Sequence, residues 1–256
     1  MQVILDLDLD FFVRPPVYHV PERGPRPSDQ AHSIWPAEAV AALLRRLGVT
    51  AAIRGRVVEH HVEALPAWMD AITRGWLAPP FRVVHVDAHE DLGYGDPLWM
   101  SFQEQVLCRP LPQRNFDEVL GLAHSGNFLL AAIALGWVGA LDLVLPGPLS
   151  PDHGRRLSDL SAHAVHFMHG VETSGAIELH AVPGLPAEAQ ARGCRKLPWV
   201  VRDPPVPVRV LAPGEVRPAT YSYWTVATSP AFCPPGADAL LPVLTAWMHS
   251  DRCPEK

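Results

Sequence analysis

The chain opens with a strand pattern in which apolar residues and aspartates alternate, ILDLDLDFF at residues 4–12. Successive side chains of a strand point to opposite faces, so Asp6, Asp8 and Asp10 are expected on one face and the leucines on the other. An ionised carboxylate that leaves water costs several kcal/mol unless it is paired. Three carboxylates on a core strand therefore predict a bound cation or another partner.

The rest of the chain alternates between strand and helix patterns. Residues 35–48 predict a helix with Pro36 in its first turn and Gly48 as its stop. The other predicted elements, besides the opening strand at 2–10, are strands at 51–61, 81–87, 140–147, 207–213 and 220–230 and helices at 62–76, 115–124, 127–137 and 236–249. The alternation predicts an α/β fold with a mostly parallel sheet, helices on both faces, and ligands beyond the carboxyl ends of the strands.

Composition narrows the class of protein. With 256 residues, of which 48% are hydrophobic, the chain is expected to form a single domain over residues 1–256. A net charge of -6 argues against nucleic acid or an anionic membrane surface as a partner and is compatible with a cationic substrate. The 14-residue apolar run from Phe128 to Leu141 is too short to span a bilayer and is interpreted as a core helix.

Cysteine usage and the N-terminus bear on the compartment. The four cysteines form no CxxC pair, so neither a zinc cluster nor a disulfide framework is predicted. The N-terminus runs directly into the acidic strand, without the basic and apolar segments of a secretory signal. A cytoplasmic protein is expected.

The string HVDAHEDL carries the clearest chemistry. Asp87 is expected at the carboxyl end of a strand, and His89 and Asp91 follow at i+2 and i+4, so all three side chains can converge on one point. Carboxylate oxygens and imidazole suit Mn²⁺, with Fe²⁺, Co²⁺ or Zn²⁺ as alternatives. Taken alone, the string is also compatible with an accidental polar loop.

Two further segments extend the candidate set. Asp8 and Asp10 lie near the carboxyl end of the first strand, whereas Asp6 sits deeper and is less expected to reach the ligands. In EHHVEALP, Glu59, His60 and His61 stand at a strand-to-helix junction, where a histidine is either a ligand or a core residue. The predicted metal ligands are Asp8, Asp10, His61, Asp87, His89 and Asp91. Their four negative charges match two divalent ions, so a two-metal site is predicted.

The strings DLDLDFF, HVDAHEDL and EHHVEALP together resemble the signatures of an arginase-related family whose members include peptide arginases of ribosomal peptide maturation. HSGNFLLAAIALG extends the resemblance more weakly. The family's E-D-H-x-E pattern falls on residues 59–63, which makes His61 the ligand and leaves His60 as the alternative. In arginases the acidic strand follows DAHxD, whereas here it opens the chain, as in a circular permutation.

The resemblance implies a three-layer arginase-like sandwich and a binuclear Mn²⁺ ureohydrolase. The expected reaction converts arginine residues of a precursor peptide to ornithine and urea, after attack of an ion-activated water on the guanidinium carbon. Asp91 is the candidate for the first proton transfer. His124 is the candidate for a later proton shuttle, with a solvent-exposed histidine at a helix end as the alternative.

The sequence says less about which substrate is bound than about which reaction is catalysed. Glu59 or Glu63 is a candidate acceptor of the guanidinium, and a solvated or supporting carboxylate is the alternative. Asn127 and Ser125 are candidates for polar recognition or for helix capping. Free arginine and agmatine are alternative substrates. The rival functions are a small-molecule ureohydrolase, a metal-dependent deacetylase and a non-catalytic, metal-stabilised binding module.

Overall fold

A nine-stranded sheet runs through the centre of the computed structural model, which describes residues 1–18, 24–93, 99–146, 168–169, 174–177, 180–181, 200–201 and 203–251. In spatial order its strands are β13 (Met248–Ser250), β4 (Ile53–Val58), β12 (Tyr223–Ala227), β1 (Val3–Asp8), β5 (Phe81–Val86), β6 (Val138–Val144), β11 (Val206–Leu211), β8 (Ser174–Ile177) and β7 (Met168–His169). Two short pairs stand apart: β2 (Val13–Arg14) with β3 (Ser33–Ile34), and β9 (His180–Ala181) with β10 (Val200–Val201).

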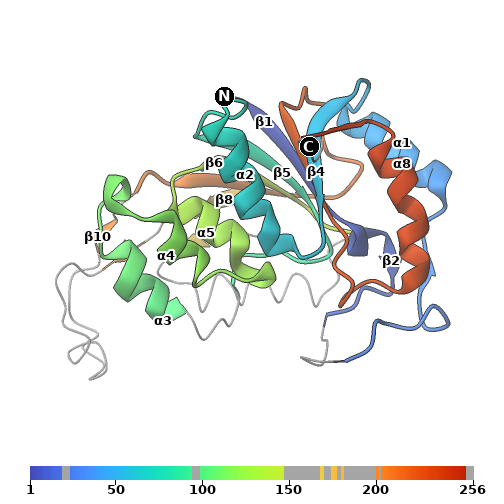
Figure 1. Ribbon diagram of the computed structural model, residues 1–256, viewed down its shortest axis with the longest axis horizontal. Helices are drawn as coiled ribbons and strands as arrows, with labels where there is room; N and C mark the ends of the chain where they lie inside the picture. The colour runs from blue at the N-terminus through green and yellow to red at the C-terminus, as the bar shows by residue number, and fades with distance from the viewer. Residues whose placement is uncertain are drawn as a thin grey trace, which may run out of the picture.

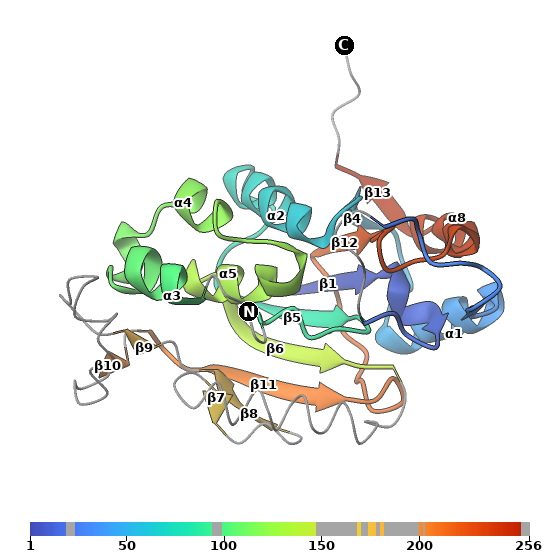
Figure 2. The ribbon, with the colours of Figure 1, turned by 90° about the horizontal axis from the view of Figure 1, so that it is seen from below.

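The sheet is parallel from β13 to β11. β8 pairs antiparallel with β11 and β7 pairs antiparallel with β8, so β8 alone among the described strands of this sheet runs against the others. The arrowheads of β1, β5, β6 and β11 accordingly point toward the same edge in Figure 2. The first strand of the sequence, β1, lies at the centre, between β12 and β5. The expected α/β fold with a mostly parallel sheet is confirmed.

Helices cover both faces of the sheet, which makes three layers (Figure 1). The helices are α1 (Ala37–Leu47), α2 (Ala64–Thr73), α3 (Trp99–Phe102), α4 (Phe116–Leu120), α5 (Phe128–Ala134) and α8 (Leu241–Thr245), with 3-10 turns at 9–12, 61–63, 111–113, 125–127 and 235–240 and a π turn at 103–107. One core packs Trp68 of α2 and Phe128 of α5 on one face of the sheet. The other packs Leu44 of α1 and Leu244 of α8 on the opposite face.

Helix α1 shows why the sequence pattern was informative. Its buried residues Val40, Leu43, Leu44 and Leu47 recur at helical spacing. Pro36 stands at the N-cap, and Gly48 closes the helix at φ +98°, a backbone conformation that favours glycine. The predicted helix and its stop at Gly48 are confirmed, while Pro36 stands one position before the first turn in which it was expected.

The strand expected at 2–10 is wrong at its carboxyl end. The extended chain stops at Asp8, whose carboxylate accepts a hydrogen bond from the Asp10 backbone N–H at 3.0 Å and begins the 3-10 turn at 9–12. Asp6 and Asp8 therefore share a strand face, whereas the turn places Asp10. The local side-chain bond ends the strand where alternation alone would continue it.

Two helix predictions are also wrong in part. The apolar run from Phe128 to Leu141 is not one helix: α5 ends at Ala134, Gly136 adopts φ +72°, and β6 begins at Val138. The helix expected at 236–249 divides into a 3-10 turn, the short α8 and the edge strand β13. Apolar runs of this kind satisfy helix and buried strand equally well, so periodicity could not place the boundaries.

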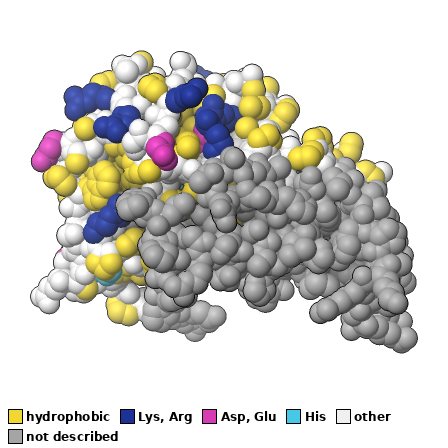
Figure 3. Space-filling model, turned by 180° about the vertical axis from the view of Figure 1, so that it is seen from behind, with side chains coloured by type: hydrophobic (Ala, Val, Ile, Leu, Met, Phe, Trp, Pro, Cys, Tyr) yellow, Lys and Arg dark blue, Asp and Glu magenta, His cyan; other side chains and the backbone are white. Residues whose placement is uncertain are grey.

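Other surface features add few constraints. No described helix is both long and apolar enough to cross a bilayer. Cys233 is a buried free thiol and Cys108 is partly buried, while Cys194 and Cys253 lie outside the described residues. On the described part of the face shown in Figure 3, basic and acidic side chains are interspersed with hydrophobic ones.

Candidate metal centre

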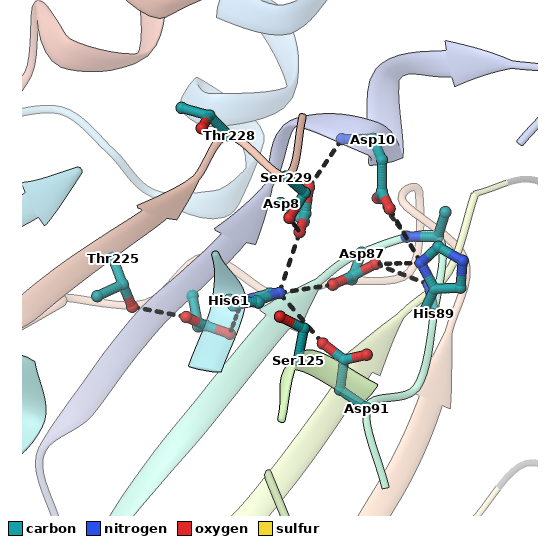
Figure 4. Close-up of polar contacts among 12 residues, drawn as sticks. Asp8, Asp10, His61, Asp87, His89, Asp91, Ser125, Thr225, Thr228 and Ser229 are labelled. Atoms are coloured by element: carbon teal, nitrogen blue, oxygen red, sulfur yellow. Dashed lines mark hydrogen bonds and ion pairs between the residues drawn. The ribbon is translucent and has the colours of Figure 1, made fainter. Parts of the chain in front are cut away.

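The six predicted ligands lie together at the carboxyl edge of the parallel sheet (Figure 4). Asp8 ends β1, Asp87 follows β5, and His61 begins the short turn after β4. β1 and β5 are adjacent, and only β12 separates β4 from β1. The carboxyl ends of these parallel strands therefore bring the three side chains to one place. Most of these side chains are almost fully buried; the most exposed, His89, is 17% exposed.

A first cluster surrounds His61. Its Nδ1 atom lies 3.1 Å from Asp8 Oδ2, 3.0 Å from Asp87 Oδ2 and 3.1 Å from Asp91 Oδ2. We call these four residues the His61 cluster. Donor atoms about 2.1 Å from an octahedral ion lie about 3.0 Å apart along an edge, so His61 Nδ1 lies at ligand spacing from each of the three carboxylate oxygens.

A second cluster surrounds His89 and shares Asp87 with the first. His89 Nδ1 lies 2.9 Å from Asp10 Oδ2 and 3.3 Å from Asp87 Oδ1. We call Asp10, Asp87 and His89 the His89 cluster. Asp87 thus turns one oxygen toward each histidine, as a carboxylate does when it bridges two ions.

Both histidines are oriented by a bond on the far side of the ring. His61 Nε2 lies 2.9 Å from Asp6 Oδ2, and His89 Nε2 lies 3.0 Å from the carbonyl oxygen of Val17. The carbonyl can only accept, so His89 Nε2 carries a proton, and ionised Asp6 calls for the same at His61. In each neutral ring Nδ1 then presents a lone pair to the cluster, the arrangement found in metal-binding histidines.

Three of the polar atoms that face inward lack hydrogen bonds. Among the residues that the structure describes, Asp10 Oδ2, His61 Nδ1 and Asp87 Oδ2 are buried without a hydrogen-bond partner. Lone pairs of nitrogen and ionised oxygen about 3 Å apart repel one another, and buried polar atoms in native proteins are almost always satisfied. A divalent ion in each cluster resolves both problems, so these residues fit a metal pair.

The pKa values of the two histidines and of Asp91 show that the clusters attract positive charge. Burial alone would lower the pKa of His61 and of His89, but the neighbouring aspartates, Asp6 for His61 and Asp10 for His89, raise both well above the ordinary value. Burial, with the charge of Asp87, raises the pKa of Asp91 to about 7. Without metal, protons therefore take the place of the cations at neutral pH.

Asp6 does not join either cluster and instead holds His61 from behind. Its carboxylate accepts hydrogen bonds from His61 Nε2, from His85 Nδ1 at 2.8 Å and from Thr225 Oγ1 at 2.6 Å. His85 and Thr225 stand opposite Asp6 in the register of β5 and β12, so the sheet itself assembles the group. The prediction that Asp6 sits too deep to join the ligands agrees with this geometry.

Sequence reasoning missed three of these supporting residues. His85 precedes Asp87 by two positions and therefore shares its strand face, a signal that was present in HVD. Ser229 donates a hydrogen bond from Oγ to Asp8, and Val17 orients His89, but both come from segments distant in the sequence. Asp91 and Ser229 also adopt φ +50° and +40°, conformations that non-glycine residues take rarely and often at functional sites.

The neighbouring glutamates lie outside the clusters. His61 is 1% exposed and His60 is 55% exposed, so the structure places only His61 among the carboxylates. Glu63 accepts a hydrogen bond from the Glu59 backbone N–H at 3.0 Å. The Glu59 side chain is 69% exposed and lines a cavity of about 580 Å³ together with Thr228 and Leu241.

The segment from His124 to Asn127 forms a capped 3-10 turn beside the clusters. Asn127 is fully buried; its side-chain oxygen accepts from the His124 backbone N–H at 2.7 Å, and its amide donates to the Leu122 carbonyl at 3.1 Å. His124 Nδ1 accepts from the Gly126 backbone N–H at 3.2 Å, and its side chain is exposed. Ser125 lies near His61 and Asp91 in Figure 4. The capping alternative for Asn127 and the exposed helix-end alternative for His124 are thus present, and the roles of both residues in the reaction stay predictions.

No family model matches the chain, and neither a curated protein nor a solved structure matches it. The geometry of the two clusters is therefore the structural evidence that bears on the function.

Proposed function

We propose that this protein is a binuclear, manganese-dependent hydrolase that converts arginine residues of a peptide to ornithine and urea. The observation that carries the proposal is the pair of His–Asp clusters that share Asp87 at the carboxyl edge of a parallel sheet. The resemblance of DLDLDFF, HVDAHEDL and EHHVEALP to arginase-related proteins names the reaction. An arginase-like sandwich with permuted chain order is part of the same proposal.

The donor set favours Mn²⁺, with Fe²⁺, Co²⁺ and Zn²⁺ as alternatives. Asp8, His61, Asp87 and Asp91 would hold one ion, and Asp10, His89 and Asp87 the other. These ligands are oxygens with one imidazole per cluster, without sulfur, which suits hard and borderline cations. When bound, such a pair lowers the pKa of water and supplies a nucleophile at neutral pH.

Asp91 has the geometry of a proton carrier. Its Oδ2 atom lies in the His61 cluster, and its backbone is held by the hydrogen bond from Leu129 N–H to its carbonyl at 3.2 Å. We assign it the proton of the attacking water and the delivery of that proton toward the leaving nitrogen. A carbon–oxygen bond forms and the bond from the guanidinium carbon to the side-chain nitrogen breaks. The leaving nitrogen takes both protons of the water, one through Asp91 and one from the new C–O–H group, so that neutral urea and the ammonium group of ornithine result. Exposed His124 would exchange the proton with solvent.

The carboxylates at this edge of the sheet favour a positively charged substrate group such as a guanidinium. The clusters carry four carboxylates and lie at the end of a strand that bears a fifth, so a cation is attracted to them. Glu59, on the wall of the cavity of about 580 Å³, is the candidate contact for a cationic group of the peptide. Glu63 and Asn127 are engaged by the local backbone, so we rank Glu59 before them.

The test is hydrolysis of arginine-containing peptides by the manganese-loaded full chain. The expected result is loss of a CN₂H₂ unit per processed arginine by mass spectrometry, with urea in equal amount. Asp87→Asn is the inactive control, and Asp117→Asn, an exposed substitution in α4, is the matched active control. Equal turnover of free arginine would support the small-molecule ureohydrolase. Removal of acyl groups from lysine would support the deacetylase, and no turnover of either would support the binding module.

A further inference from the structure

We propose that the cavity of about 580 Å³ beside β4 binds an extended segment of a basic peptide, which adds as a strand to the open edge of β4. The bound segment flanks the arginine that is processed at the metal centre. This inference rests on the proposed function for the identity of the peptide, whereas its evidence is the sheet edge and the cavity. We call the cavity the edge groove.

The outer edge of β4 is covered over only part of its length. β13 is the last strand of the sheet and pairs with β4 from Ile53 to Gly55, while β4 itself continues to Val58. The Asp251 backbone N–H donates to the Gly55 carbonyl at 3.0 Å. Among the described residues, no strand pairs with this side of β4 beyond Gly55, so the carboxyl half of the edge is open.

Val57 directs its backbone groups toward this opening. Alternate residues of a strand point their N–H and C=O groups to the same side. Ile53 and Gly55 bond on the β13 side, whereas the Val58 carbonyl accepts from the Thr228 backbone N–H at 3.0 Å on the β12 side. Val57 alternates with Gly55 and therefore presents its N–H and carbonyl to the edge groove, which it lines. Such groups at a sheet edge are a template for another strand.

Helix α8 forms the wall opposite this edge. Leu241 and Thr245 of α8 line the edge groove together with Val57 of β4 and Met248 of β13, and α8 lies beside these two strands in Figure 2. A space of about 580 Å³ is within the range of about 300–1,000 Å³ that ligand sites occupy. A peptide between a sheet edge and a helix bonds to the edge through its backbone, and its alternate side chains fill the groove.

The charge of the edge groove favours a basic peptide. The ionisable side chains among its described lining residues are Arg26, Glu59 and Asp238. Arg26 and Asp238 pair with each other at 2.8 Å, whereas Glu59 is 69% exposed, so the net charge of the lining is negative. An exposed ion pair contributes little affinity. We therefore expect the backbone to supply most of the binding and Glu59 to select against acidic peptides.

The edge groove borders the segments that carry the metal ligands. Glu59 stands two residues before His61, and Thr228 immediately precedes Ser229, which donates a hydrogen bond to Asp8. These segments follow the carboxyl ends of β4 and β12, which are adjacent strands. A peptide bound in the edge groove is therefore held beside the metal centre, where a neighbouring arginine of the same peptide is processed.

The test measures peptide binding without turnover. The probe is an octapeptide of alternating valine and lysine, in which the valine face fits the apolar wall of the groove. The probe has no arginine to hydrolyse. Calorimetric titration of the manganese-loaded full chain compares it with two versions N-methylated on alternate amides, one version for each edge of the peptide strand. Methylation of the edge that faces β4 should weaken binding about tenfold or more, and methylation of the other edge should change it little.

Variants of the chain locate the binding. Thr245→Trp fills the edge groove and should weaken the probe about tenfold or more. Ala246→Trp places the same ring at the next, exposed position, outside the described lining, and should bind within about twofold of the wild type. Glu59→Lys should weaken the valine–lysine probe and strengthen a valine–glutamate peptide. Thermal unfolding of the manganese-loaded variants checks their fold, and the methylation comparison needs no variant.

The proposal is overturned if the wild type does not bind the probe at millimolar concentration, if both methylated peptides bind equally, or if a folded Thr245→Trp binds the probe as the wild type does. Equal affinity for a valine–lysine dipeptide would show a small-molecule site instead. Expected probe binding without urea release from any arginine peptide would refute the proposed reaction and leave the edge groove. An arginine peptide that wild type and Thr245→Trp hydrolyse with equal kcat/KM would leave the reaction and refute the edge groove.

Discussion

Replacing Asp6 by asparagine tests the division between ligands and the residues behind them. Asparagine keeps the shape of the side chain and one oxygen, which can accept the hydrogen bonds of His61 Nε2 and His85 Nδ1, while its amide faces Thr225. The acceptor of these two hydrogen bonds thereby changes from a charged carboxylate to a neutral amide oxygen. Since a charged hydrogen bond contributes about 1 kcal/mol more than a neutral one, the metal-free protein should lose about 2 kcal/mol of unfolding free energy.

Asp6→Asn should also weaken metal binding, by an amount similar to its effect on the fold and short of complete loss. A residue that orients a ligand typically changes metal affinity 10- to 100-fold, or about 1.4–2.8 kcal/mol. Asp6→Asn should therefore bind Mn²⁺ weakly but measurably, with the ion of the His61 cluster affected first. Asp8→Asn, which removes a predicted ligand, should lose that ion, and exposed Asp117→Asn should match the wild type in both respects.

Isothermal titration with Mn²⁺ and thermal unfolding of the metal-free chains measure both quantities. A loss of about 2 kcal/mol corresponds to a fall of roughly 4–8 °C in Tm for a domain of this size. Loss of all metal binding in Asp6→Asn, equal to that in Asp8→Asn, would show that Asp6 is itself a ligand. Wild-type affinity together with wild-type Tm would refute the orienting network.

Four further predictions concern the metal centre and its substrate. Asp87→Asn should lose both ions and all activity while it stays folded, and full metal content by elemental analysis would contradict the shared carboxylate. Metal affinity should fall as pH falls from 8 to 6. The pKa values of His61, His89 and Asp91 are raised, that of Asp91 to about 7, so bound protons must leave these groups before the ions enter. Calorimetric titrations in two buffers of different ionisation enthalpy should detect this proton release, and it should be larger at pH 6. Remote peptide contacts should make free arginine more than about tenfold worse in kcat/KM than a peptide substrate, and Glu59→Gln should raise KM for the peptide with little change in kcat.

Local sequence determined much of the fold. Helical spacing and the Pro36 and Gly48 boundaries placed α1, and alternation of strands with helices placed β1, β4, β5 and β12 in a mostly parallel sheet. The sequence did not place the ends of elements where one hydrophobic pattern is compatible with both a helix and a strand. The apolar run after Phe128 is helix, then turn, then strand, and β13 at the sheet edge follows α8 without a change in composition. Partner strands decide such cases, because they are what supplies the hydrogen bonds and the packing.

The candidate site divides in the same way. Sequence by itself identified the carboxylates and histidines of the two clusters, because buried Asp and His at strand ends demand positive charge wherever they lie. The resemblance favoured His61 as the ligand and left His60 as the alternative, and only packing buried one ring and exposed the other. The supporting residues come from three segments of the chain: Val17, His85 on β5, and Thr225 with Ser229 on and just after β12. Sheet register and chain reversal bring them within hydrogen-bonding distance of the ligands, and distances between remote segments exist only once the chain has folded.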